Sequence, residues 1–165
     1  MPNILWILTF TLLALPLHAS AKLAILACEP EWASLAQEIG GDKIEAHAAT
    51  TAHQDPHHIQ ARPSLIAKAR RADILVCSGA ELEAGWLPIL LRKSGNAKIQ
   101  QGQPGNFFAA DYIEKEDLPE KLDRSMGDVH AEGNPHFLLD PTEGIRAARL
   151  VCERLSELVP AHKEE

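Results

Sequence analysis

Two short, almost entirely apolar segments constrain the fold of this chain most. Residues 22–28 (KLAILAC) and 73–78 (DILVCS) lack the alternation of apolar and polar residues that a strand with one wet face shows. Both are therefore expected to be strands buried on two faces. Helical patterns follow them at residues 32–39 and 86–93. This alternation predicts an α/β fold with a parallel sheet flanked by helices.

Weaker patterns complete the expected sheet and its helices. Residues 43–49 and 97–100 are expected to be strands, which makes a sheet of about four, and residues 63–71 a helix that begins with proline. Residues 101–134 are rich in glycine, proline and charge, and a loop of this length is usually functional or mobile. A last helix is expected over residues 140–159. Its predicted apolar stripe consists of Ile145, Ala148, Cys152, Leu155 and Val159.

The N-terminal segment is predicted to be removed from the chain. Residues 4–17 form an apolar run too short to span a bilayer, and Ala19 and Ala21 supply the small residues of a cleavage site. We therefore expect residues 1–21 to be a cleavable signal peptide, with export and no stable membrane insertion after cleavage. An uncleaved anchor is the alternative. Residues 25–28 resemble a lipoprotein box, but a first strand explains them better.

Composition argues against one class of partner. The chain has 165 residues, 45% of them hydrophobic, which is enough for the core of one domain. Its formal charge is −7, and it has no cluster of basic residues. Because binding to nucleic acid or to an anionic membrane surface relies on such a cluster, neither is expected.

Three cysteines raise the question of a disulfide. Cys28 and Cys77 each stand at the carboxyl end of a predicted strand, and export would put them where disulfides persist. If the two strands are neighbours, a Cys28–Cys77 disulfide is geometrically feasible. Two buried thiols are an equally good interpretation. Cys152 is left as an odd thiol on the last helix.

Two histidines that follow prolines are the leading candidates for chemistry. His57 lies in Asp55-Pro56-His57-His58, and His136 lies in Asn134-Pro135-His136. Imidazole is the commonest metal ligand, and a rigid turn fixes the direction of the ring. The loop with His57 follows the second predicted strand, so it should emerge at the edge of the sheet where ligands bind. The sequence therefore predicts a metal site that includes His57 and His136.

Other side chains could complete or support such a site. His130 is a candidate third ligand from the long loop. Asp55, Glu81 and Glu83 are candidate acceptors for the second nitrogen of a ligating ring. For Glu81, capping of a turn or plain solvent exposure explains the residue equally well.

Taken in order, the motifs of this chain resemble those of one protein family. They are Glu29-Pro30-Glu31-Trp32, Asp55-Pro56-His57, Arg62-Pro63-Ser64, Gly79-Ala80-Glu81-Leu82-Glu83, Gly133-Asn134-Pro135-His136 and Leu139-Asp140-Pro141. Together they are similar to the periplasmic zinc- and manganese-binding proteins of ABC importers.

The resemblance implies a two-lobed protein whose metal is bound between the lobes. Residues 22–140 would be the N-terminal metal-binding lobe, and residues 141–165 the start of a long interlobe helix with a charged tail. His57 and His136 would be the two ligands of this lobe. Family members are about twice as long, and their second lobe supplies a histidine and an acidic ligand. The chain is therefore expected to be a truncated, one-lobe form in which water completes the coordination of the metal.

Three hypotheses about function follow. The first is a periplasmic solute-binding protein, not an enzyme, that binds Zn²⁺ or Mn²⁺ and delivers it to the membrane permease of an ABC importer. The second is a small exported zinc-dependent hydrolase, for which the sequence shows neither a general base nor a substrate pocket. The third is a half-protein that pairs with a second lobe, or with itself, through the surface that would face the missing lobe.

Overall fold

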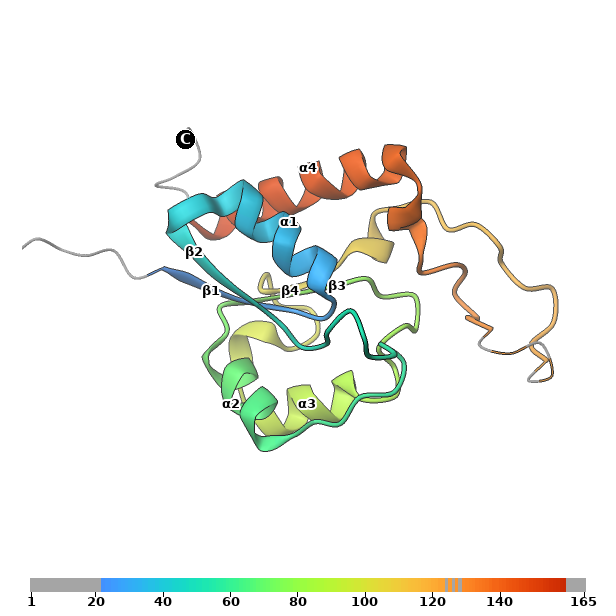
Figure 1. Ribbon diagram of the computed structural model, residues 1–165, viewed down its shortest axis with the longest axis horizontal. Coiled ribbons are helices and arrows are strands. Elements are labelled where there is room, and N and C mark those ends of the chain that lie inside the picture. Colours follow the sequence, from blue (N-terminus) through green and yellow to red (C-terminus); the bar gives the residue numbers. More distant parts are fainter. Residues whose placement is uncertain (1–21, 124, 126, 128, 160–165) are drawn as a thin grey trace, which may run out of the picture.

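The fold is a parallel sheet between two layers of helices (Figure 1). A computed structural model describes residues 22–159 with the exception of 124, 126 and 128. The predicted signal peptide over residues 1–21 and the charged end of the tail from residue 160 lie outside the described residues. The predicted α/β class with a sheet of four parallel strands is confirmed.

The sheet has its two most apolar strands at the centre. Its order is β2-β1-β3-β4, with β1 spanning Leu23–Ala27, β2 Ile44–Ala48, β3 Ile74–Cys77 and β4 Asn106–Phe108. Every residue of β3 is buried, as are the last three of β1. A strand with helices on both faces has no wet side, which is why these two segments carry no polar alternation.

The fourth strand is not where the sequence placed it. The predicted strand over residues 97–100 is instead a 3-10 turn, Ala97–Ile99, because the side chain of Asn96 caps it by accepting a hydrogen bond from the Lys98 amide. The chain then turns, and β4 forms at Asn106–Phe108. Gly105 makes this pairing possible, since a Cβ there would lie 2.5 Å from the carbonyl oxygen of Asp73.

Helices α1 (Pro30–Gly40) and α4 (Pro141–Leu158) cover one face of the sheet, and α2 (Pro63–Arg71) and α3 (Leu87–Ser94) cover the other. Each helix has a proline in its first turn.

The apolar stripe predicted for α4 is wrong in part. Its buried residues are Ala147, Val151 and Leu155, whereas Ile145 is 59% exposed and Cys152 is exposed.

A disulfide joins the two central strands at their carboxyl ends. The structure bonds the sulfurs of Cys28 and Cys77, whose Cα atoms lie 4.8 Å apart, and both residues are fully buried. Cys28 directly follows the last residue of β1, and its backbone N–H donates to the Val76 carbonyl oxygen at 2.8 Å. Within residues 22–159, the three gaps aside, no helix has the length and apolar character needed to cross a membrane.

Candidate metal centre

Three histidines meet at the edge of the sheet where the strands end. They are His57, His130 and His136, and one ring nitrogen of each lies within 4.8 Å of the others. The Nε2 atoms of His57 and His130 are 3.1 Å apart. His57 comes from the loop after β2, and the other two come from the segment before α4. The structure thus brings together both predicted ligands and the candidate third one.

The loop that carries His57 is anchored to the residues just before α3. Trp86, just before α3, donates its Nε1–H to the carbonyl oxygen of Pro56 at 2.7 Å. Gly85 lies so close that a Cβ there would come within 2.9 Å of the His57 carbonyl oxygen. The His57 side chain is only 19% exposed. Packing and a buried hydrogen bond therefore fix this histidine in advance.

Asp55 orients the His57 ring. Its Oδ1 accepts hydrogen bonds from the His57 backbone N–H at 2.9 Å and from Nδ1 at 2.7 Å, and these bonds lower the pKa of Asp55 to about 2. Because a carboxylate only accepts, Nδ1 carries the proton and Nε2 presents its lone pair toward His130. His58, 73% exposed, bonds the other oxygen of Asp55 and lies outside the histidine cluster.

The segment of His130 is held by contacts to its backbone. Glu81, predicted as a partner for a ligating ring, accepts a hydrogen bond from the Ala131 N–H at 2.6 Å. Three residues further on, the Asn134 N–H donates to the Glu116 carbonyl oxygen at 2.9 Å. These bonds fix the path of the chain on both sides of residues 132 and 133.

His136 sits between a turn and a core anchor. The Oδ1 of Asn134 accepts from the His136 N–H at 2.9 Å, which closes a local side-chain turn. The next residue, Phe137, packs its ring 6.2 Å from that of Trp32. The His136 ring itself is exposed and lies 6.3 Å, centre to centre, from the His57 ring.

The donor set suits a borderline metal ion. A tetrahedral ion about 2.1 Å from each nitrogen separates its ligands by about 3.4 Å, close to the 3.1 Å between His57 and His130. Three imidazoles leave a fourth position open. Nitrogen ligation favours Zn²⁺, whereas Mn²⁺ prefers more oxygen ligands.

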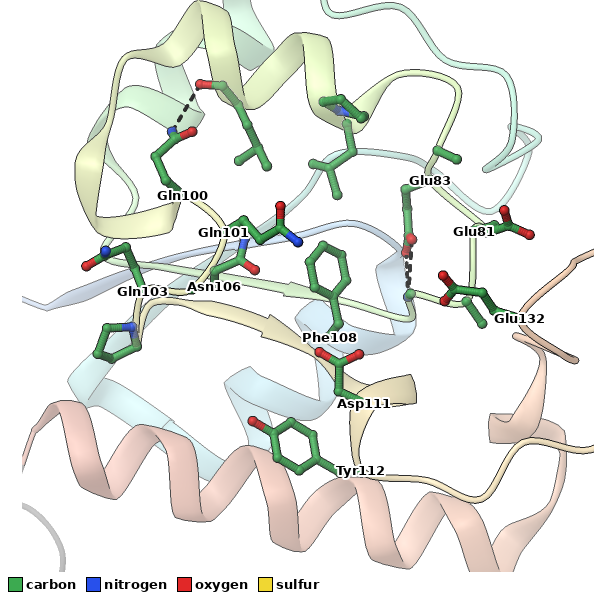
Figure 2. Close-up of a pocket in the computed structure, with 18 of the residues that line it drawn as sticks. Glu81, Glu83, Gln100, Gln101, Gln103, Asn106, Phe108, Asp111, Tyr112 and Glu132 are labelled. Atoms are coloured by element: carbon green, nitrogen blue, oxygen red, sulfur yellow. Dashed lines mark hydrogen bonds between the residues drawn. The ribbon is translucent and has the colours of Figure 1, made fainter.

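A hollow of about 870 Å³ lies nearby but is separate from the histidines. It runs between α3 and α4 along the open edge of β4, and Phe108, Asp111 and Tyr112 form part of its lining (Figure 2). None of the three histidines lines it, although Glu81 and Glu132 stand at its rim.

Sequence reasoning offered Glu83 as a candidate acceptor but missed Glu29 and the burial of both carboxyl groups behind the centre. Glu29 is 3% exposed and Glu83 is 2% exposed. Burial, reinforced by the other carboxylate, raises the pKa of Glu29 to about 9, and burial raises the pKa of Glu83 to about 7. The signal that could have revealed Glu29 was its position, two residues after the buried end of β1 at Ala27.

Comparison with known proteins agrees with this geometry. Residues 25–165 match the family described as the periplasmic component A of the zinc-uptake complex. The chain belongs to that family. The resemblance noted from the motifs is thereby confirmed.

Named relatives of the zinc-uptake component A family include bacterial lipoproteins. The chain is 31% identical over 149 residues to the metal ABC transporter substrate-binding lipoprotein ScbA of Streptococcus cristatus, covering 88% of this chain and 44% of that protein. It is 29% identical over 147 residues to the manganese ABC transporter substrate-binding lipoprotein PsaA of Streptococcus pneumoniae, covering 87% and 44%. The chain thus spans about half the length of the curated relatives it matches.

Solved structures of this kind share the fold. A manganese-bound periplasmic metal-binding protein of Candidatus Liberibacter asiaticus superposes with a TM-score of 0.67 at 20% identity, over 85% of this chain and 47% of that one. The metal-dependent lipoprotein YcdH of Bacillus subtilis gives a TM-score of 0.65 at 22% identity, over 87% and 47%. At such identities the likeness supports the architecture.

Proposed function

We propose that this chain binds Zn²⁺ through His57, His130 and His136 as a substrate-binding protein of a metal ABC importer. The observation that carries the proposal is the approach of three ring nitrogens to within 4.8 Å at one edge of the sheet. Membership of the zinc-uptake component A family supports the transport role. Mn²⁺ is the alternative ion, because a relative that is 29% identical is named for manganese.

Location and partners follow from the same role. The chain would act outside the cytoplasm, as its relatives named lipoproteins do, and would hand its ion to a membrane permease. Residues 22–140 would form a metal-binding lobe, and residues 141–165 would begin the connection to a second lobe that supplies the remaining ligands. The division into these segments is a prediction, as is the cleavage of residues 1–21.

Binding rather than hydrolysis fits the surroundings of the centre. The family is one of transport proteins, which supports a non-enzymatic role. A zinc hydrolase places a substrate pocket at its ion, whereas the 870 Å³ hollow is lined by none of the three histidines. Steady turnover of an ester or phosphate substrate by the zinc-loaded chain would reverse this preference.

Calorimetric titration tests the proposal. Zn²⁺ should bind the purified chain, and His57→Ala, His130→Ala and His136→Ala should each weaken binding at least tenfold, since each removes one nitrogen ligand. His53→Ala is the matched control, because His53 is an exposed histidine of the same loop outside the cluster. Unchanged affinity in the His57 and His136 variants would refute the proposal. Parallel titrations with Mn²⁺ decide between the two ions.

A specific observation favours pairing with another lobe or copy at this edge. Leu139 is 87% exposed three residues after His136, and Leu118 is 65% exposed near Gly133. Exposed apolar residues beside a half-open metal centre suit a surface that another subunit covers. Light scattering with and without Zn²⁺ measures this: a monomer under both conditions contradicts self-association.

A further inference from the structure

The buried carboxyl pair has a definite attachment to the backbone. Oε1 of Glu83 accepts a hydrogen bond from the Ser78 N–H at 2.9 Å. Its Oε2 accepts from the Gly79 N–H at 3.1 Å, a contact drawn dashed beside Glu83 in Figure 2. Both amides lie directly after β3. Glu83 therefore clamps the start of the turn from which it projects.

The clamped turn has an uncommon backbone. Gly79, Ala80 and Glu81 have φ angles of 81°, 49° and 68°, so three consecutive residues are left-handed. For residues with a side chain this conformation is sterically unfavourable. Two of the three have a side chain, so the turn persists only because its surroundings hold it. The Glu83 carboxylate is the strongest such hold on the first two amides.

This turn places the side chain of Glu81 against the segment that carries His130. Its Oε2 accepts from the Ala131 N–H at 2.6 Å, a contact between residues 50 apart in the sequence. In Figure 2, Glu81 projects from the far side of the turn, on the side where Glu132 lies. A right-handed backbone at Glu81 would point its side chain in another direction. The bond to Ala131 therefore depends on the left-handed turn.

Glu29 lets Glu83 remain an acceptor inside the protein. Ser78 Oγ donates to Glu29 Oε2 at 3.2 Å and accepts from Trp32 Nε1 at 2.8 Å, which holds the Glu29 carboxyl behind the turn. Because burial raises the pKa of Glu29 to about 9, Glu29 keeps its proton at neutral pH. The pair then carries at most one negative charge rather than two, and that charge can lie only on Glu83.

We propose that Glu83 is a positioning residue of the metal centre: through the left-handed turn it sets Glu81 against the Ala131 amide and so holds His130 within reach of His57 and His136. The proposal rests on the proposed metal-binding function and deepens it. His57 and His136 have their own anchors. The path from Glu83 through Glu81 ends at Ala131, the neighbour of His130, so its effect can be separated from those anchors.

A double-mutant cycle on Zn²⁺ affinity tests this path. Glu81→Ala and Glu83→Gln should each weaken binding about tenfold, the size usual for residues that orient a ligand. In a His130→Ala background neither change should weaken binding further, because the ligand they position is gone. A merely structural role predicts the same loss in both backgrounds. Glu114→Gln, at an exposed acid, is the charge-matched control.

The outcomes separate the two proposals. If Glu81→Ala leaves Zn²⁺ affinity intact while His57→Ala abolishes binding, the positioning path is wrong and the metal site stands. The same holds if the losses persist without His130. If His57→Ala and His136→Ala bind Zn²⁺ normally, the metal site itself is wrong. Should Glu83→Gln fail to fold, Glu81→Ala at the exposed end of the path decides alone.

Discussion

The carboxyl ends of β1 and β3 and the histidine cluster beside them are built on different principles. The strand ends hold a buried disulfide and two buried carboxyl groups. The cluster is held by turns whose side chains bond to nearby backbone, as Asp55 does for His57 and Asn134 for His136. Changes at the strand ends should therefore affect stability, and changes in the turns should affect metal affinity. Glu83 is the residue whose substitution we expect to affect both stability and metal affinity.

Removing the disulfide should have the largest effect, and on stability only. The double variant Cys28→Ala/Cys77→Ala lacks the disulfide between residues that are 49 apart in the sequence. Its free energy of unfolding should be lower by about 2–4 kcal/mol. Zn²⁺ affinity of the folded variant should stay within about twofold, because the bridge touches no histidine of the cluster. Urea unfolding and calorimetry measure the two quantities. Cys152→Ala is the control, and a large loss of affinity would break the comparison.

Asp55→Asn should show the opposite pattern. Loss of the charged acceptor for His57 Nδ1 should weaken Zn²⁺ binding about 10- to 100-fold. The free energy of unfolding should change by no more than about 0.5 kcal/mol, because the side chain of Asp55 is 52% exposed. His58→Ala removes the second partner of Asp55 and should leave affinity within about twofold. Equal losses in both variants would show that Asp55 does not act through His57.

The smallest effect concerns pH. The folded pKa of Glu29 lies near 9, well above its ordinary value of 4.5, so between these values the folded chain holds a proton that the unfolded chain releases. Stability from this group is therefore complete below pH 4.5 and is lost as pH rises toward 9. Glu29→Gln should unfold with a shallower decline between pH 5 and pH 8. The control is Glu38→Gln, at an exposed acid of α1. A slope for Glu29→Gln as steep as that of the parent or of this control contradicts the prediction.

The sheet could be predicted from sequence because its signal is local. Residues 22–28 and 73–78 are apolar enough to become β1 and β3 in any compact arrangement, and strand order then places His57 at the ligand-binding edge. The fourth strand failed for an equally local reason. Nothing in residues 97–100 shows that Asn96 would turn them into a 3-10 helix by bonding to the Lys98 amide.

Only part of the candidate site could be predicted from the sequence. The sequence marks His57 and His136 by the prolines before them. The contact between His57 and His130 spans 73 residues, which no local pattern encodes. The role of Glu29 escaped for a similar reason, since Glu29 and its partner Ser78 are 49 residues apart in the sequence. Long-range hydrogen bonds between polar groups leave no periodic trace in a sequence.

The exposed thiol on α4 gives this chain a built-in attachment point. With Cys28 and Cys77 bonded to each other, Cys152 is the one thiol of the three cysteines that a reagent can modify. It sits on the helical layer, away from the turns that carry the histidines. A maleimide nitroxide at Cys152 and a paramagnetic ion in the histidine cluster would allow the distance between helix and metal centre to be measured. No engineered residue is needed for this.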